Sequence, residues 1–214
     1  MNKTVIFDLD GTLLDTLTDI HEQMNLALKH FGYPERNYKE MRAFIGNGAR
    51  KLVERSFGDL TEETLPDKLD YYNKIYTACG SPKTGLYQGI DKVLVNLKER
   101  GFKLAILTNK PQMTTDDVYK TYLEKFGFDK VVGQSGTVKC KPDKTATLKI
   151  LQELDTLPEN AYFIGDGETD IITAKNAGIK SIAVLWGYRD KEQLVEAGAT
   201  TFATSPQDLI SLII

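Results

Sequence analysis

Two aspartates near the start of the chain are spaced for metal-assisted chemistry. Residues 8–12 read Asp-Leu-Asp-Gly-Thr and directly follow an apolar run at residues 5–7. Side chains at positions i and i+2 of a strand lie on the same side, so Asp8 and Asp10 are expected to leave the strand end together. Carboxylates held this close repel each other unless a cation or a shared proton intervenes. A hard divalent cation with oxygen ligands resolves this repulsion, and Mg²⁺ suits a site made of carboxylates and phosphate.

Three further segments place polar groups after other apolar runs. Thr108 and Asn109 end one run, where their side chains and the following backbone N–H groups can hold phosphate oxygens. Lys141 supplies a cation before a helix, and Asp166 and Asp170 end another run next to a helix N-terminus. Ligands of doubly wound sheets bind outside the carboxyl ends of the strands, so these segments are expected to converge on one pocket.

The elements that would position these residues alternate along the chain. Continuous apolar runs are typical of strands covered on both faces of a parallel sheet, and they occur at residues 5–7, 104–107, 131–132, 162–164, 182–185 and 201–203. Helix-period patterns lie between the runs, such as the one at residues 90–97, which Gly101 should end. This alternation predicts an α/β fold with a doubly wound, mainly parallel sheet, a Rossmann-like core.

The segment from residue 15 to residue 83 has a different pattern. It contains helical stripes, such as the one that includes Ile20, Met24 and Leu28, and no convincing strand. We therefore predict a small, all-helical insert at residues 15–83, placed after the first strand. Residues 1–14 and 84–214 would then form the Rossmann-like core.

Composition narrows the classes of partner. The 214 residues carry a net charge of −3, so there is no overall basic field to attract nucleic acid or an anionic membrane. No apolar stretch approaches the length of a transmembrane helix, and no signal peptide pattern is present. Cys79 and Cys140 lie far apart, with no CxxC pattern. We expect a cytoplasmic protein, a monomer or weak homodimer, that binds neither nucleic acid nor membrane.

Taken in order, the four polar segments resemble the motifs of the haloacid dehalogenase-like hydrolase superfamily. The matching positions are residues 8–12, Thr108, Lys141 and residues 165–170. The helical insert at residues 15–83 resembles the cap domain of that superfamily, which would make residues 1–14 and 84–214 the catalytic core. Three shorter segments resemble the phosphoglycolate phosphatase-like subgroup, namely residues 45–48, 108–111 and 186–189. Gly167 departs from the commonest pattern, in which serine or threonine is frequent at this position.

The resemblance implies a Mg²⁺-dependent phosphatase that hydrolyses a small phosphorylated metabolite, with phosphoglycolate as the leading substrate. Asp8 would be the nucleophile and form an aspartyl-phosphate. Asp10 would be the general acid for the leaving oxygen and then the base for water. Thr108 would donate to a phosphate oxygen, and Lys141 would offset the charge on Asp8 and the phosphoryl group.

The resemblance also implies ligands for the metal and contacts for the substrate. Mg²⁺ would be held by Asp8, Asp10 through its backbone carbonyl, Asp166 and Asp170, the last holding a metal-bound water or orienting Lys141. Candidate substrate contacts are Gly11, Thr12, Asn109 and, in the cap, Asn47 and Arg50. The Arg50 guanidinium could form a bidentate pair with a substrate carboxylate.

Other functions stay open at this stage. A sugar-phosphate phosphatase or a phosphomutase of the same superfamily would use the same residues, and the mutase would return the phosphoryl group to a sugar. A phospho-acceptor signalling domain also uses a strand-end aspartate and Mg²⁺, but such domains are shorter, lack a cap and carry their aspartate later in the chain. A catalytically silent binding protein is disfavoured by the intact Asp8 and Asp10.

Overall fold

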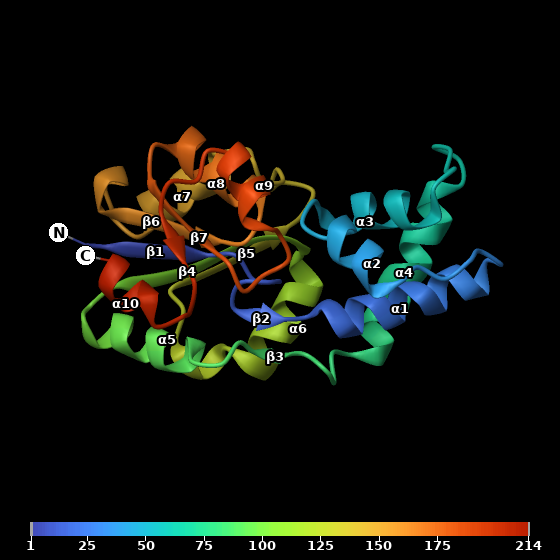
Figure 1. Ribbon diagram of the computed structural model, residues 1–214, viewed down its shortest axis with the longest axis horizontal. Helices are drawn as coiled ribbons and strands as arrows, with labels where there is room; N and C mark the ends of the chain where they lie inside the picture. The colour runs from blue at the N-terminus through green and yellow to red at the C-terminus, as the bar shows by residue number, and fades with distance from the viewer. Residues whose placement is uncertain (1, 214) are drawn as a thin grey trace.

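A computed structural model describes residues 2–213, which form two lobes (Figure 1). One lobe is built on a six-stranded sheet of order β5-β4-β1-β6-β7-β8, in which all neighbours are parallel. The strands are β1 (Thr4–Phe7), β4 (Lys103–Pro111), β5 (Lys130–Gln134), β6 (Ala161–Gly165), β7 (Lys180–Val184) and β8 (Phe202–Ala203). The predicted doubly wound parallel sheet is confirmed.

Helices cover both faces of this sheet, which explains its continuous apolar runs. In β1, Val5 and Phe7 pack in a core with residues of α5, α6 and α10, whereas Ile6 packs on the other face with residues of α7 and α8. All three side chains are fully buried, so both faces of the strand must be apolar. The helices of this lobe are α5 (Ile90–Glu99), α6 (Gln112–Tyr122), α7 (Thr145–Glu153), α8 (Glu168–Ala177), α9 (Lys191–Glu196) and α10 (Asp208–Leu212), with single 3₁₀ turns at Glu124–Phe126 and Pro158–Asn160.

Each predicted run coincides with a strand, to within two residues at the ends except for β4, which extends four residues past its run. Leu185 follows β7 and Thr201 precedes β8. Strand β4 continues past its apolar run to Pro111, and its register with β5 shifts between Leu107 and Pro111. The polar residues at positions 108–110 therefore lie in the irregular end of a strand, at the carboxyl edge of the sheet.

Four helices form the second lobe, the cap, and they lie within the segment predicted to be helical. They are α1 (Leu17–His30), α2 (Tyr38–Phe44), α3 (Gly48–Phe57) and α4 (Leu65–Cys79). The cap has its own apolar core, in which Ile20, Met24, Met41 and Val53 are buried. Tyr188 from the sheet lobe joins this core, so the two lobes share packed surface.

A short ribbon connects the two lobes at both crossings of the chain. Strand β2 (Leu14–Asp15) pairs antiparallel with β3 (Gly85–Leu86). Next to this ribbon, the buried Asp19 accepts hydrogen bonds from the Lys83 backbone N–H and the Thr84 hydroxyl. The start of the cap is thus tied to its end. Among residues 2–213, no helix combines the length and apolarity needed to cross a bilayer.

Candidate active site

The loop after β1 brings Asp8 to the edge of the sheet with its carboxylate largely buried. Gly11 makes the turn with φ +83°, a backbone conformation that side-chain-bearing residues rarely adopt. A Cβ atom at Gly11 would overlap the Asp166 carboxylate, so the glycine is also needed for space. The Thr12 hydroxyl donates a 3.0 Å hydrogen bond to Asp166. Gly11 and Thr12, predicted to contact substrate, here accommodate and hold a neighbouring carboxylate.

Lys141 forms ion pairs with two carboxylates. Its Nζ atom lies 2.8 Å from Asp8 Oδ1 and 2.6 Å from Asp170 Oδ1, and its side chain is 1% exposed. Burial lowers the pKa of Lys141, but the charges of Asp170 and Asp8 and their hydrogen bonds outweigh that effect, so its pKa lies above the usual range. Lys141 therefore remains an ammonium, fixed beside Asp8.

Asp8, Asp166 and Asp170 form a buried group of carboxylates. One oxygen from each lies within 4.8 Å of the others. Burial, reinforced by the charge of Asp170, raises the pKa of Asp8 to about 7 despite the opposing effect of Lys141. Burial and the charge of Asp8 raise the pKa of Asp166 to about 6, and burial also raises the pKa of Asp170. Three carboxylates thus share one ammonium, which leaves an excess of negative charge that a divalent cation would neutralise.

Glycines give this group its close packing. A Cβ atom at Gly165 would overlap the Asp170 side chain, and one at Gly187 would overlap Asp166. The Gly167 backbone N–H donates to Asp170 at 2.9 Å, at the start of α8. Close packing against the glycine backbone and hydrogen bonds therefore fix the positions of the carboxylates. Such fixed positions are expected of residues that must keep one geometry for a ligand.

Asp10 does not join the three carboxylates but pairs with Lys110. The Lys110 Nζ atom lies 3.1 and 3.2 Å from the two Asp10 carboxylate oxygens. The same ammonium lies 4.5 Å from the centroid of the Tyr76 ring, in the cap. The sequence marks Lys110 as part of a polar strand end but gives no signal for this pairing, because the direction of its side chain depends on the irregular end of β4.

Thr108 and Asn109, both buried, occupy different roles in the structure. The Thr108 hydroxyl oxygen accepts a 3.2 Å hydrogen bond from the Lys110 backbone N–H. Thr108 also lines the main cavity, which lies between the two lobes. The Asn109 amide donates to the carbonyl oxygens of Gly46 and Lys141 and accepts from the Lys141 backbone N–H. Asn109 thus links the cap to the core, and it also lines the main cavity, where the predicted substrate contact would be made.

The two cap residues predicted to contact substrate, Asn47 and Arg50, lie in different places. Asn47 precedes α3 and, with Asp8, Asp10 and Asp166, lines a small cavity. Arg50 does not reach the site: its side chain is 53% exposed and pairs with Glu54 and Glu62, both in the cap. In this arrangement Arg50 does not line the main cavity, because α3 directs Ala49 and Leu52 toward it and a residue one position from Ala49 points about 100° away.

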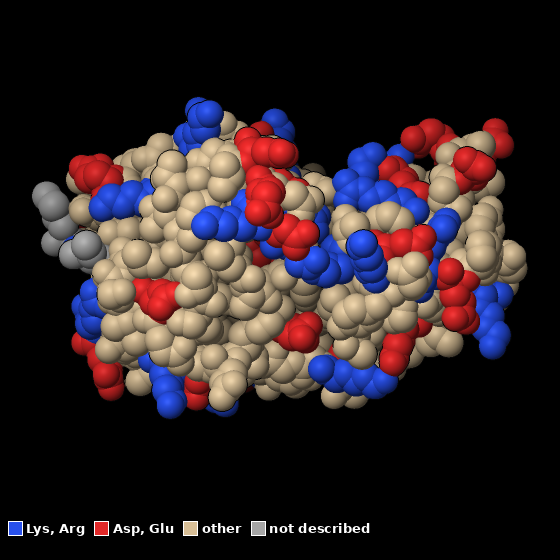
Figure 2. All heavy atoms as spheres, viewed as in Figure 1, with Lys and Arg blue, Asp and Glu red and all other residues tan. Residues whose placement is uncertain are grey.

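The main cavity lies between the two lobes and is small. Its volume is about 60 Å³, and it extends from Asp8, Asp10 and Thr108 to a cap wall. That wall consists mainly of Ile20, Ile45, Ala49, Leu52, Tyr72 and Tyr76. Charged side chains of both signs gather along the seam outside, where the surface is hollowed between the lobes (Figure 2).

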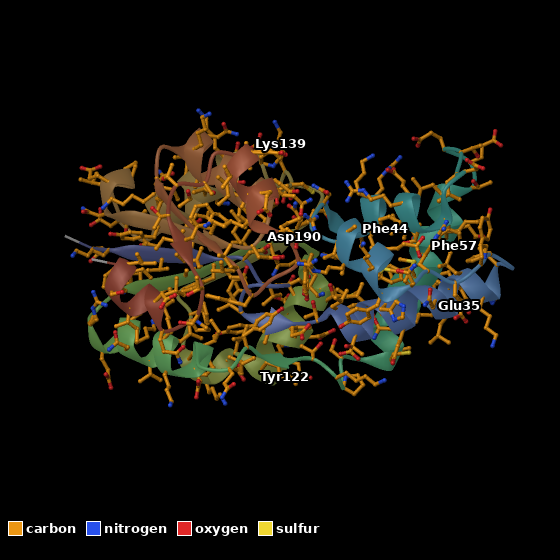
Figure 3. All side chains as sticks on the ribbon, in the orientation of Figure 1. Glu35, Phe44, Phe57, Tyr122, Lys139 and Asp190 are labelled. Atoms are coloured by element: carbon orange, nitrogen blue, oxygen red, sulfur yellow. The ribbon has the colours of Figure 1, made fainter. Side chains whose placement is uncertain are left out.

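Arg189, which follows β7, fastens the cap to the core. The sequence singles it out only as part of the segment 186–189 and predicts no role for it. Its Nε atom donates to Glu168, and its terminal nitrogens donate to the carbonyl oxygens of Arg42 and Ile45, in and after α2, at 3.1 and 2.5 Å. Next to it Arg42 pairs with Asp190, which Figure 3 labels at the seam. Arg189 is buried, so these bonds are shielded from water and should favour the closed arrangement.

Replacing Arg189 by Met should therefore loosen the cap. We expect kcat/KM for the phosphatase activity that the sequence motifs imply to fall by about 10–100-fold, because a loosened cap would exclude water from the site less well. Limited proteolysis should also cut faster within residues 80–84. Arg50→Met is the matched control, since Arg50 pairs only within the cap. Unchanged kinetics and proteolysis in Arg189→Met would contradict this role.

Comparison with known proteins places this site in a family. The family model described as haloacid dehalogenase-like hydrolase matches residues 5–184. A phosphoglycolate phosphatase from Vibrio cholerae is 31% identical over 202 residues, covering 91% of this chain and 89% of the relative. A phosphoglycolate phosphatase from Aquifex aeolicus is 34% identical over 186 residues, covering 87% of this chain and 86% of the relative.

Solved structures agree with these sequence matches. A haloacid dehalogenase-like family hydrolase from Streptococcus pneumoniae superposes with a TM-score of 0.88 at 27% identity, covering 100% of this chain and 99% of the other. The parallel sheet, its helical cap and the relatives define a phosphoric monoester hydrolase. The chain belongs to the haloacid dehalogenase-like hydrolase family.

Proposed function

We propose that this phosphatase hydrolyses small, acidic phosphate monoesters, with 2-phosphoglycolate as the leading substrate, through an aspartyl-phosphate on Asp8 and with the aid of Mg²⁺. The observation that carries the proposal is the position of Asp8, which lies at the cavity, paired with Lys141 and adjacent to two further buried carboxylates. A carboxylate so placed can attack phosphorus while its charge is balanced locally.

The residues present suit a magnesium ion. Mg²⁺ prefers oxygen ligands. One or two protein carboxylates are enough to bind it when the phosphate of the substrate supplies further oxygen ligands. Asp8 and Asp166 would hold it, together with the backbone carbonyl of Asp10, and Asp170 would hold a bound water or keep Lys141 in place. When bound, the ion would neutralise the carboxylates and the phosphate, so that an anionic nucleophile can approach an anionic ester.

The transfer needs two displacements at phosphorus. In the first, an oxygen of Asp8 bonds to phosphorus and the bond from phosphorus to the ester oxygen breaks. Asp10 is a carboxylate paired with Lys110 in this structure, so it must take up a proton in the complex with the ester, and it gives that proton to the leaving alcohol oxygen. In the second, Asp10 takes a proton from water, the water oxygen bonds to phosphorus, and the bond between phosphorus and Asp8 breaks. Phosphate leaves, and both aspartates return to their starting forms.

Thr108 and Lys141 would hold the phosphoryl group during both displacements. The Thr108 hydroxyl oxygen accepts from the Lys110 backbone N–H, which leaves the hydroxyl proton available for a phosphate oxygen. The Lys141 ammonium, fixed by Asp170, lies where negative charge gathers during transfer. Charge arranged in advance in this way is the main source of catalysis in phosphoryl transfer.

The substrate assignment rests on the names of the relatives. Phosphoglycolate phosphatases from several bacteria are about as similar to this chain as the two described above, for example one from Psychrobacter arcticus at 31% identity over 206 residues.

A panel of small phosphate esters assayed with Mg²⁺ tests the proposed function. We expect 2-phosphoglycolate to have the highest kcat/KM, release of free phosphate in step with the alcohol, and loss of activity after chelation of the metal. Glucose 1-phosphate belongs in the panel, because a phosphomutase would convert it into another sugar phosphate without releasing phosphate. That product, or phosphate release unaffected by chelation, would overturn the proposal.

A further inference from the structure

The main cavity is lined by a lysine side chain on the wall where a leaving group would lie. Lys110 is the sole lysine or arginine among the described residues that line the main cavity, and Lys141 lies beyond Asp8. The cap wall opposite is largely apolar and aromatic, apart from Asn73 and the hydroxyl groups of Tyr72 and Tyr76. A leaving group that enters this space therefore meets apolar surface on one side and the Lys110 ammonium on the other.

Lys110 is held next to the atom that the leaving group must approach. Its ammonium forms two hydrogen bonds to the Asp10 carboxylate, and Asp10 is the residue that would protonate the ester oxygen. An ammonium carries three N–H donors, so Lys110 can donate to Asp10 and also to a second acceptor, which would replace part of its contact with Tyr76. A carboxylate one carbon away from the ester oxygen would lie within reach of that second position.

The surroundings of Lys110 keep its ammonium protonated and exclude water from it. Its side chain is 5% exposed, and the Tyr76 ring lies against the ammonium. Burial alone would lower the pKa of Lys110, but the charge of Asp10 and the contact with Tyr76 raise it above the usual range. Charges interact more strongly in a site from which water is excluded, so an anion bound here would be held well.

We propose that Lys110 binds an anionic group of the leaving alcohol, a carboxylate close to the ester oxygen, and thereby selects small acidic phosphate esters over neutral ones. This inference rests on the proposed function and adds the residue that would determine specificity. It also replaces Arg50, which faces away from the cavity, as the cation that recognises the substrate carboxylate.

Two esters of nearly equal size test the role of Lys110. 2-Phosphoglycolate carries a carboxylate where 2-hydroxyethyl phosphate carries an uncharged hydroxymethyl group. We expect wild type to prefer the acidic ester by at least about tenfold in kcat/KM, since a hydrogen bond to a charged group is worth that much or more. Lys110→Met should lower kcat/KM for 2-phosphoglycolate by about 100-fold, chiefly through KM, and should affect the neutral ester far less.

Controls separate recognition from positioning of Asp10. Lys110→Arg keeps the charge and should keep the preference, and Lys175→Met removes an exposed lysine on α8 and should change neither ester. An equal fall of kcat on both esters in Lys110→Met, or no preference in wild type, would overturn this inference and leave the proposed function standing. The wild-type comparison decides even if the variant does not fold. No turnover of either ester by wild type would overturn the proposed function as well.

Discussion

Replacing Asp8 by Asn should lower kcat on every small phosphate ester by more than about 10⁴-fold, because the amide is too weak a nucleophile to form the phosphorylated intermediate. The change should leave the fold intact. Asn has nearly the same shape as Asp, and Lys141 still has its ion pair with Asp170 at 2.6 Å. The substitution also removes one of three buried carboxylates that repel each other, so the variant should be at least as stable as wild type in the absence of metal.

Phosphate release and a trapped intermediate provide the measurements. Acid quenching of wild type during turnover should leave one phosphoryl group on the peptide that contains Asp8, and mass spectrometry of the variant should find none. Asp70→Asn, an exposed substitution on cap helix α4, is the control for the loss of one carboxylate and should behave as wild type. Residual turnover within tenfold of wild type would show that another group attacks phosphorus.

Much of the fold follows from the sequence because a parallel sheet covered on both faces leaves a strong pattern. Val5, Ile6 and Phe7 are all apolar since each face of β1 meets a different helix layer. The glycine at position 101 also marks the end of α5 for a local reason, its φ of +79°. The ribbon of β2 and β3 could not be foreseen, since two residues per strand are too few for any periodicity to appear.

The candidate site also has a part that the sequence predicts and a part that it does not. Asp8, Asp166 and Asp170 meet because parallel strands β1 and β6 are neighbours and end at the same edge, a consequence of topology. The Lys110 and Asp10 pair and the Arg189 contacts depend instead on side-chain direction and on how the cap docks. The position of Arg50 away from the cavity has the same cause: the sequence places it on a helix near the site but does not say which face of that helix turns inward.

The same carboxylates that would bind Mg²⁺ should destabilise the protein when the metal is removed. The pKa of Asp166 is raised to about 6 and that of Asp8 to about 7, so from about pH 4 up to these values the folded protein holds protons that the unfolded chain has already lost. As far as these groups decide it, the stability of the metal-free protein should therefore be highest at or below about pH 4, and fall as pH rises from there to about 7. The fall due to Asp166 alone should be on the order of 2–3 kcal/mol.

Binding of Mg²⁺ should restore the stability that the metal-free protein loses at high pH. The Asp166→Asn variant should not gain this stability from Mg²⁺. At 100 times its Kd, a ligand that binds only the folded state stabilises by about 2.7 kcal/mol, which corresponds to a rise in Tm of roughly 5–10 °C for a chain of this size. In Asp166→Asn this rise should disappear at pH 7.5. The metal-free variant should also lose less stability between pH 4.5 and 7.5 than wild type does, and its kcat/KM should fall by at least about 100-fold.

Thermal unfolding with and without Mg²⁺ at several pH values distinguishes these effects from a general loss of packing. Asn at position 166 forgoes part of the hydrogen bonding from Thr12 and the Tyr188 backbone N–H, so its absolute Tm in the absence of metal is a poor guide. The pH slope and the response to metal do not depend on that loss. Asp91→Asn, an exposed substitution in the first turn of α5, should keep both wild-type responses. A wild-type Tm that is indifferent to Mg²⁺ at pH 7.5 would contradict the assignment of these carboxylates as metal ligands, because the excess negative charge among them is what gives the ion its binding free energy.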